Sequence, residues 1–449
     1  MTRLTDWLEE RTGLPSVLRK ILEEPVPGGA RWSYVLGSSI VFVLAVQALT
    51  GVLLALNYAP TSEGARASLA FIQEQVAAGR LLHGVHHWGA GAMVALVGFH
   101  LLQVFLWGAY RNPREATWIV GVFLFLTTLA FAFTGSLLPW DQNAYWAVQV
   151  GLSIVGTTPW IGHALQRVLQ GSAEIGNLTL TRFYTLHVII LPIIVFTLLG
   201  LHVYLFLRRG VTPHWSLSEE EGKHRREPFY PYQLARDVGI MVLMLAVILW
   251  LAITFPPMLG APADPSRAYE ARPDWYFLFL FELLKYLEGP LELVGTLLLP
   301  AGSVLFLLAI PFLDRSPSRS PLKRLPVVVP MLVGVIGIAG LTGKSLLVGR
   351  EERRAQRVEE VRRARVLEEG GALLREQPCL KCHRLGEEGR DRGPDLTHYG
   401  GAGRSSEELI AHLKDPKVLH PNTIMPSFAH LPDRDLELLV EFLRLQGVD

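Results

Sequence analysis

The sequence predicts an all-α membrane protein: a polytopic bundle of seven membrane-spanning helices followed by a small all-α domain. Half of its 449 residues are hydrophobic and only 18% are charged. Seven apolar runs are each long enough to cross a hydrocarbon core about 30 Å thick. They cover residues 33–57, 83–107, 117–138, 183–207, 237–256, 291–313 and 327–348. The formal net charge of +1 gives no electrostatic basis for binding nucleic acid, and two cysteines in so long a chain exclude a disulfide framework.

Residues 1–32 precede the first span and mix charged with apolar side chains. The apolar residues form an amphipathic pattern of two groups: Leu4, Trp7 and Leu8, and then Val17, Leu18, Ile21 and Leu22. The segment lacks the short apolar core and small-residue cleavage site of a signal peptide. We therefore expect an amphipathic helix that lies on the membrane surface.

Positive charge is concentrated in the connections that follow the even-numbered spans. These residues are Arg111 and Arg114 after the second span, Arg208, Arg209, Lys223, Arg225 and Arg226 after the fourth, and Arg315, Arg319, Lys323 and Arg324 after the sixth. The positive-inside rule then places the amino terminus and these connections on the cytoplasmic side. We expect a multi-pass protein of a bacterial inner membrane, with its carboxyl-terminal domain on the outer, periplasmic side.

Two of the apolar runs each contain a pair of histidines: His86 with His100, and His187 with His202. On a helix, a separation of fourteen or fifteen residues returns a side chain to nearly the same face about 21 Å further along. A lone helix histidine is usually a hydrogen-bonded structural residue, but four ionisable rings at matched spacing inside lipid indicate function. An iron held by two imidazoles has no open position and transfers electrons. We predict two haem b groups, one between His86 and His187 and the other between His100 and His202.

The topology supports this pairing independently. Because the second and fourth spans run in the same direction, His86 and His187 fall at the same outer level and the other two histidines at the inner level. Four glycines in the neighbouring spans show the same period: Gly37 with Gly51, and Gly121 with Gly135. A haem edge that approaches a helix backbone needs positions without a Cβ atom.

A second motif lies near the carboxyl end, where Cys379 and Cys382 are followed directly by His383. This Cys-x-x-Cys-His spacing is typical of covalent haem c attachment, in which the histidine binds the iron. A redox pair or half of a zinc site fits less well, because the chain has no other cysteine. Met425 is the predicted sixth ligand, since a thioether is common there and raises the reduction potential. The alternative ligands are His398, His412, His420 and His430.

Several short strings resemble cytochrome b of the quinol-oxidising cytochrome bc complexes and their chloroplast and cyanobacterial relatives. The resemblance covers residues 30–348 and includes the strings 85–88, 113–115, 138–142, 181–184 and 273–276. The fifteen-residue spacing of His187 and His202 resembles the chloroplast branch, in which the last three spans form a separate subunit. Here they are fused and followed by a class I-like cytochrome c domain.

Together with the observations above, the resemblance divides the chain into a surface helix over 1–32, a dihaem core over 33–222, a three-helix region with the quinol-site loop over 223–348, a charged linker over 349–377 and a cytochrome c domain over 378–449. It also implies that quinol is oxidised at an outer site between the loop 135–146 and the loop 273–276. One electron goes to a Rieske iron-sulfur centre, and the other passes through two haem b groups to an inner quinone site. The reaction is coupled to proton translocation.

The resemblance also implies partners. A Rieske centre needs two cysteines of its own, and both cysteines of this chain belong to the haem c motif, so the Rieske protein is a separate chain. The haem c domain is expected to accept the Rieske electron and pass it to a soluble cytochrome or other acceptor. The family further implies a homodimeric, multisubunit complex.

Residue roles follow from the same resemblance. Asp274 is the expected proton acceptor for quinol, since a carboxylate in an apolar pocket can have its pKa raised. Its local sequence alone also fits an aspartate that caps the following helix. Tyr276 and Trp140 are expected to line the pocket, and Arg114 is expected to bind an inner-haem propionate. Aspartate rather than glutamate at position 274 favours a low-potential quinone such as menaquinone.

The chain departs from the chloroplast branch at several positions. Val35 stands where that branch attaches an extra haem through a cysteine, so we expect none here. His83 and His87 replace two arginines of that branch, and Arg80 or His83 is a candidate substitute as a partner for haem propionates. The alternative function is a non-bifurcating dihaem b and haem c module that connects quinol to a dehydrogenase or reductase.

Overall fold

The computed structural model describes residues 2–217, 226–267 and 269–446, so Lys223, Arg225 and the expected boundary at residue 222 lie outside the described residues. The chain divides into two compact units, Met1–Ser345 and Leu346–Asp449. Both units are mainly helical, and the described strands form two small two-stranded sheets.

The described residues include seven helical segments that are long and apolar enough to cross a membrane, which confirms the predicted all-α bundle of seven spans. They contain α3 (Val35–Ala55), α5 (Gly79–Leu106), α6 (Glu115–Ser136), α9 (Asn177–Thr185) continued by α10 (Leu191–Arg209), α12 (Leu234–Thr254), α14 (Leu299–Leu313) and α15 (Leu325–Glu376). These helices expose many large apolar side chains, as lipid-facing helices do.

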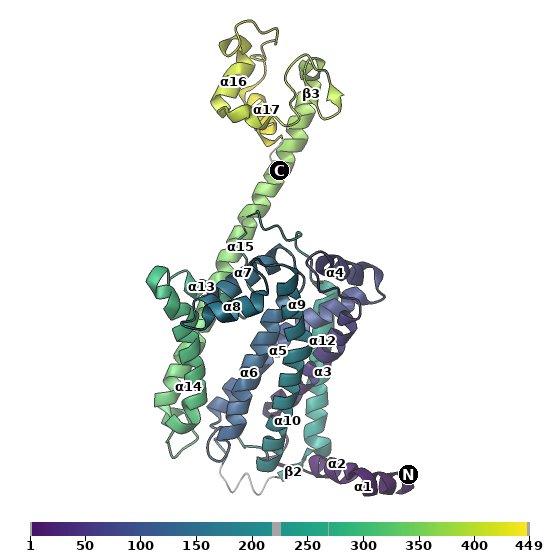
Figure 1. Cartoon of the computed structure of the whole chain (residues 1–449), viewed down its shortest axis with the longest axis vertical. Helices are drawn as coiled ribbons and strands as arrows, with labels where there is room; N and C mark the ends of the chain where they lie inside the picture. The colour runs from purple at the N-terminus through teal and green to yellow at the C-terminus, as the bar shows by residue number, and fades with distance from the viewer. Residues whose placement is uncertain (1, 218–225, 268, 447–449) are drawn as a thin grey trace. The chain divides into compact units, whose positions relative to one another are not determined.

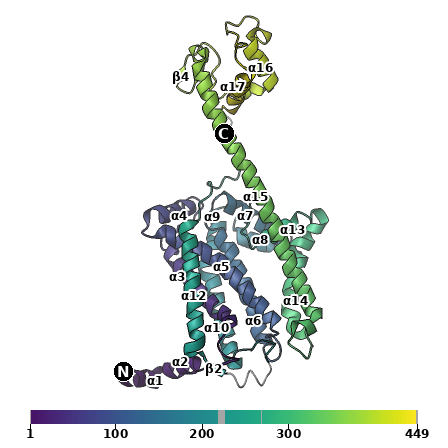
Figure 2. The same cartoon turned by 180° about the vertical axis from the view of Figure 1, so that it is seen from behind.

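Helices α3, α5, α6, α10 and α12 run side by side in both views of the first unit (Figures 1 and 2). Val43, Val85 and Ile248 form part of a buried cluster between α3, α5 and α12. Small residues allow the close packing, because a Cβ atom added at Gly84 would lie 2.8 Å from the Cβ of Ala252.

The amino terminus forms two helices rather than the single surface helix expected from sequence. These are α1 (Thr2–Thr12) and α2 (Leu14–Leu22), and the chain between them passes through Gly13 with φ +63°. Leu4, Trp7 and Val17 are exposed on these helices. The following strand β1 (Pro25–Pro27) pairs with β2 (Arg226–Pro228), and the short helix η1 (Trp32–Tyr34) leads into α3.

Short helices gather at one end of the bundle: α4 (Gly64–Gln75), α7 (Gln142–Gly156) and α8 (Gly162–Gln170), as Figure 1 shows. They share a buried apolar cluster with the start of the fourth span, and this cluster includes Ala65, Trp140, Val148 and Leu180. Since the spans enter the membrane directly below these helices, the cluster holds the connecting loops in fixed positions.

The last two spans are joined to the rest of the bundle by a second cluster. Phe105, Trp118, Ile310 and Val327 are buried there, at the ends of α5, α6, α14 and α15. The intervening short elements are α13 (Leu278–Leu284), η4 (Gly289–Leu291), the π-helical turn Val294–Leu298, η6 (Pro321–Lys323) and, before α12, the π-helical turn Phe229–Gln233.

An ion pair connects α13 to the last span. The ammonium of Lys344 lies 2.9 Å from the carboxylate of Glu282, whose side chain is only 4% exposed. The hydrogen bond from Lys344 is the largest of the effects that lower the pKa of Glu282 below its usual value. The buried carboxylate therefore stays ionised and holds α13, which follows the loop of Asp274, against α15.

Arg324 is the largest fully buried side chain of the described residues. Its guanidinium donates to the carbonyls of Phe105 at 3.1 Å and Leu106 at 2.6 Å and to the hydroxyl of Tyr110 at 2.8 Å. It also lies 3.6 Å from the carboxylate of Asp314, which accepts a hydrogen bond from Tyr110 at 2.5 Å. One buried cation thus joins the ends of α5 and α14 to the start of α15.

The second unit packs around one apolar core that includes Leu374, Leu396, Leu409 and Leu439. Its elements are the carboxyl-terminal part of α15, η7 (Pro378–Lys381), β3 (Arg384–Leu385) paired with β4 (Glu388–Gly389), η8 (Gly400–Gly403), α16 (Ser406–Lys414), η9 (Pro416–Val418) and α17 (Asp433–Leu445). Helix α15 extends through the expected linker 349–377 as far as Glu376, and its last turns contribute to this core rather than being solvated on all sides.

We expect Arg324→Met to destabilise the first unit by about 3–5 kcal/mol, because it leaves the buried Asp314 carboxylate without its cation. Thermal unfolding of the purified protein in detergent measures the change. The double variant Arg324→Met with Asp314→Leu should recover part of the loss, since it removes the uncompensated charge as well. Equal stability of the single variant and the wild type would contradict the assignment.

Candidate functional site

The structure brings His86 of α5 and His187 of the fourth span face to face. Their ring centroids are 6.4 Å apart and the ring planes make an angle of 75°. An imidazole nitrogen binds a first-row metal ion at about 2.0 Å, so two rings on opposite sides of one ion have centroids roughly 6 Å apart. The separation of these two rings therefore fits one iron held between them.

Two threonines orient the facing rings. The hydroxyl of Thr50 donates to the carbonyl of Val46 at 2.7 Å and lies 2.9 Å from Nδ1 of His86. Since that hydroxyl proton is already used, its oxygen accepts from Nδ1–H, which leaves Nε2 of His86 unprotonated. Thr134 repeats the arrangement with Nδ1 of His187 at 2.9 Å. Both rings are thus held in the tautomer that can bind a metal through Nε2.

Each of the four predicted glycines lies against the ring of one histidine. A Cβ atom added at Gly51 would lie 3.1 Å from Cε1 of His86, and at Gly135 2.7 Å from Cε1 of His187. At the other level the corresponding distances are 3.3 Å from Gly121 to His202 and 3.9 Å from Gly37 to His100. The sequence analysis assigned these glycines to the approach of a haem edge, whereas the structure shows that they also make room for the imidazole itself.

The second pair, His100 and His202, is turned toward the opposite helices α3 and α6 through these glycine contacts. Nδ1 of His100 is buried and has no hydrogen-bond partner within the described part of the chain. Apolar surroundings rarely hold such rings without a polar partner. Each of these rings thus lies against a glycine of a neighbouring helix, as the outer rings do.

A π-helical turn explains why His187 and His202 are fifteen residues apart rather than fourteen. The turn covers Leu186–Ile190 and therefore contains His187 itself. A π turn accommodates one extra residue without changing the direction of the helix. Pro192 follows it and lacks the backbone N–H that a regular helix would direct at the carbonyl of Val188. The sequence analysis did not identify this turn, although the proline one turn beyond the histidine indicates it.

Arg114, expected to bind a haem propionate, precedes α6 and donates to the carbonyls of Gly210 at 2.8 Å and Arg209 at 2.7 Å. It therefore caps the carboxyl end of α10, the helix that carries His202. The same end of the bundle holds Asp237, a buried carboxylate that accepts a hydrogen bond from Gln233 at 2.8 Å. Asp237 was not among the predicted site residues, since it stands next to Arg236 at the first position of the expected span 237–256.

Asp274 and Tyr276 lie together in the loop before α13. The phenol of Tyr276 donates to Oδ2 of Asp274 at 2.8 Å. Burial first, and then the charge of Asp274, raises the pKa of the Tyr276 phenol above its usual value, so the phenol remains a donor. The carboxylate does not act as a helix cap, because the residue that caps α13 is Phe277 and no side chain bonds there.

The neighbours of Asp274 pack on the helices that carry the haem site. The indole of Trp275 lies 3.4 Å from the position of a Cβ atom at Gly91 of α5. The ring of Phe277 lies 6.2 Å from that of Phe133 in α6, measured between centroids. Asp274 itself interacts electrostatically with His87, next to the ligand His86. The loop thus packs on α5 and α6 on the carboxyl-terminal side of Asp274.

Trp140 occupies a different environment from the one expected. Only 3% of it is exposed, and it lies in the apolar cluster of the short helices with Leu137 and Val148. The described contacts of its ring are with this cluster and with Tyr145, and none joins it to Asp274 or Tyr276. Its side chain supports the loops as a core residue rather than forming the wall that we expected.

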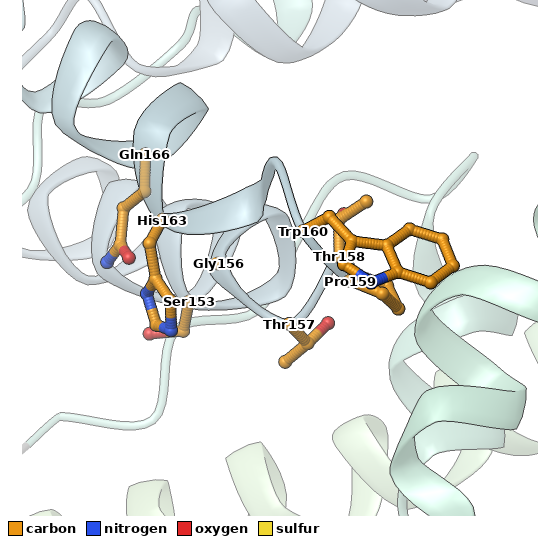
Figure 3. Close-up of a pocket in the computed structure, with 8 residues that line it drawn as sticks. All are labelled: Ser153, Gly156, Thr157, Thr158, Pro159, Trp160, His163 and Gln166. Atoms are coloured by element: carbon orange, nitrogen blue, oxygen red, sulfur yellow. The ribbon is translucent and has the colours of Figure 1, made fainter.

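An open depression of about 410 Å³ lies where α7 ends and α8 begins. Figure 3 shows His163 and Gln166 of α8 on one side of it and Trp160 on the other. Trp160 is fully exposed. The depression is a surface feature at the end of the bundle that carries the short helices, and none of its lining residues belongs to the Asp274 loop.

The haem c motif of the second unit is arranged for covalent attachment. Cys379 and Cys382 lie on one short turn, and the backbone N–H of His383 donates to the carbonyl of Cys379 at 2.9 Å. Nδ1 of His383 donates to the carbonyl of Pro394 at 2.8 Å, which leaves Nε2 to bind iron. Met425 packs against the same core cluster as Cys379.

Among the alternative sixth ligands, His412 and His420 pack against each other with ring centroids 5.6 Å apart. His430 packs against Phe428 at 6.2 Å. Met425 packs against the core cluster that Cys379 also contacts, and His412 has a buried Nδ1 without a hydrogen-bond partner among the described residues.

Comparison with known proteins agrees with this geometry. The cytochrome b subunit of a cytochrome bc complex from Chlorobaculum thiosulfatiphilum is 35% identical over 341 residues, which cover 75% of this chain and 78% of that protein. The chain belongs to the cytochrome b family. The family descriptions "Cytochrome b(N-terminal)/b6/petB" and "Cytochrome b(C-terminal)/b6/petD" match residues 91–262 and 262–347 of this cytochrome b, and "Cytochrome c" matches residues 367–446.

Two further relatives illustrate the range of the similarity. The menaquinol:cytochrome c reductase cytochrome b subunit of Bacillus subtilis is 37% identical over 220 residues, 47% of this chain and 98% of that protein. A solved structure titled "Hyperthermophilic respiratory Complex III" aligns with a TM-score of 0.68 and 28% identity, over 76% of this chain and 91% of that one. The cytochrome b and cytochrome c domains imply that this multi-pass membrane protein binds haem b and haem c.

We expect Thr50→Val to weaken binding of the outer haem by about 10- to 100-fold, because it removes the acceptor that orients His86. Haem b retained per haem c after mild extraction, read from pyridine haemochrome spectra, measures the effect. Thr128→Val is the matched control, since its hydroxyl bonds only the carbonyl of Leu124 among the described contacts. Equal haem retention in the two variants would contradict the orienting role.

Met425→Leu should lower the reduction potential of haem c, because a thioether ligand stabilises the reduced iron. A redox titration of the c-type absorbance in the intact protein measures the shift. The same titration of His412→Leu serves as the comparison. A shift in the histidine variant with none in the methionine variant would reassign the sixth ligand.

Proposed function

We propose that this cytochrome b, with its fused cytochrome c domain, is the catalytic membrane subunit of a proton-translocating quinol:cytochrome c oxidoreductase. The observation that carries the proposal is that the residues next to Asp274 and Tyr276 pack on α5, which carries His86, and on α6, which carries Thr134. A simple dihaem anchor needs no such loop. The relatives from Bacillus subtilis and Geobacillus thermodenitrificans bear the name menaquinol:cytochrome c reductase.

The residues fit two haem b groups, bound by His86 with His187 and by His100 with His202, and one haem c bound by Cys379, Cys382, His383 and Met425. When bound, these groups supply one-electron transfer, which divides the two electrons of quinol between an inner quinone site and an external acceptor. The protein holds each outer imidazole in its metal-binding tautomer through Thr50 and Thr134.

Asp274 is the proposed proton acceptor for quinol. One carboxylate oxygen is engaged by the Tyr276 phenol, which leaves the other free to accept a hydrogen bond from a quinol hydroxyl. Because the raised pKa of Tyr276 keeps the phenol protonated, Tyr276 orients the carboxylate and does not compete for the proton. Aspartate at this position and the names of the two relatives favour menaquinol as the substrate.

The two electrons of quinol leave by different routes, and the proposed partner proteins are those that accept the electron that does not enter the haem b groups. A Rieske iron-sulfur protein takes one electron at the outer, periplasmic side and passes it to haem c, which delivers it to a soluble cytochrome or other acceptor. The exposed end that carries α7 and α8, with Trp160 on its surface, is the side on which this exchange takes place. We propose a homodimeric complex in a bacterial inner membrane, with the amino terminus in the cytoplasm.

Pyridine haemochrome spectra of the purified complex test the cofactor content. The expected ratio is two haem b per haem c, with quinol-dependent reduction of haem b that an outer-site inhibitor blocks. Reduction of haem b by quinol that is insensitive to such an inhibitor would favour the non-bifurcating module.

Asp274→Asn should lower the rate of quinol oxidation by about 10²- to 10⁴-fold, the usual contribution of a positioned general base. Steady-state turnover with quinol and an artificial acceptor measures it. Asp264→Asn is the control in the same loop, since that side chain bonds only Ser266 among the described contacts. Normal turnover of Asp274→Asn would remove Asp274 from the mechanism.

A further inference from the structure

The loop that carries Asp274 is long and needs anchors. It runs from the end of α12 at Thr254 to the start of α13 at Leu278, with only turns and an isolated bridge as regular structure among its described residues. Loops of this length are uncommon in compact proteins unless they are functional. Ordering such a loop costs conformational entropy and requires partners for its backbone groups.

The first anchor is Asp141, the residue after Trp140. One carboxylate oxygen accepts from the backbone N–H of Ala144 at 2.9 Å and caps α7, and the other accepts from the N–H of Gly260 at 2.9 Å. The carbonyl of Gly260 accepts from Arg66 of α4 at 2.8 Å. Both backbone groups of Gly260 are therefore bound, and the loop is held where it leaves α12.

The second anchor is Gln142, which is buried with 5% exposure. Its amide nitrogen donates to the carbonyls of Asp264 at 3.2 Å and Arg267 at 3.1 Å, and its amide oxygen accepts from the N–H of Asp264 at 2.6 Å. Its own backbone N–H donates to the carbonyl of Ala261 at 2.9 Å. This single side chain uses both ends of its amide to bind the middle of the loop.

The third anchor is Asn143, whose side-chain oxygen accepts from the backbone N–H of Arg272 at 3.0 Å. Arg272 precedes Asp274 by two residues. On the other side of Asp274, Trp275 packs against Gly91 and Phe277 against Phe133. The chain is therefore held on both sides of Asp274: by a hydrogen bond at Arg272 before it, and by side-chain packing of Trp275 and Phe277 after it.

We propose that Asp141, Gln142 and Asn143 are positioning residues for the quinol site: three consecutive side chains at the start of α7 that hold the Asp274 loop in its reactive position. This inference rests on the proposed function. The fully engaged amide of Gln142 makes it the central member, because no other residue bonds the middle of the loop twice among the described contacts. Asn143 fixes the backbone of Arg272, two residues before Asp274.

Amide hydrogen exchange in the detergent-solubilised complex tests the anchoring without reference to activity. Gln142→Met keeps the size of the side chain but removes its hydrogen bonds, so we expect faster exchange in the peptide that covers 257–267. Gln149→Met is the matched control, because Gln149 lies exposed on the same helix. Unchanged exchange in Gln142→Met would overturn the proposal.

Turnover measurements test the positioning itself. Displacing a catalytic group by about 1 Å costs on the order of 100-fold in rate, and we expect a loss of that order in kcat for quinol oxidation by Gln142→Met. Haem content and haem potentials should remain those of the wild type. Faster loop exchange combined with wild-type turnover would overturn the positioning role.

Asn143 provides the second, milder pair of variants. Asn143→Asp retains the acceptor for the N–H of Arg272 and should keep most of the activity, whereas Asn143→Leu should lose it. Equal activities of the two variants would contradict the assignment. If the wild-type complex showed no inhibitor-sensitive quinol oxidation, the proposed function would be wrong. The exchange experiment would still decide whether these three residues hold the loop.

Discussion

The membrane unit depends on holding buried imidazole rings in opposition inside an apolar bundle. A polar ring in such surroundings is costly unless both of its nitrogens have partners. Thr50 and Thr134 engage Nδ1 of the outer rings and leave Nε2 directed at the space between the helices. The glycine opposite each ring lets it lie close to the neighbouring backbone, and the π-helical turn at His187 restores the phase of the fourth span.

The chemistry at the outer end depends on how an irregular loop is fixed to this frame. The short helices have their own apolar core, in which Trp140 is buried. The next three residues along the chain extend from that core and bond the loop that carries Asp274. Trp140 therefore stabilises the short helices by its burial, and the three polar residues that follow it fix the Asp274 loop by hydrogen bonds.

Charged side chains fix the last spans at both ends of the bundle. At one end Arg324 is buried among carbonyls, a phenol and the Asp314 carboxylate, and at the other Lys344 pairs with Glu282. Each charge lies where a long side chain can meet several backbone or acidic oxygens, so its desolvation is offset. The Arg324 contacts join the part that resembles a separate subunit of the chloroplast branch to the rest of this fused chain, and the Lys344–Glu282 pair joins two helices within that part.

The sequence by itself determined the seven spans, the histidine and glycine periods and the haem c motif, because apolar length and residue spacing on a helix are local properties. It also pointed to Asp274 and Tyr276 through a resemblance. Only the tertiary structure decided that the glycines face the imidazoles, that two threonines contact the rings of His86 and His187, that Trp140 is a core residue and that Asp141, Gln142 and Asn143 bond the loop that carries Asp274. Those contacts join residues that are far apart in the chain, up to about 130 positions in the case of Asn143 and Arg272. No local pattern records them, because they depend on which faces of the helices meet.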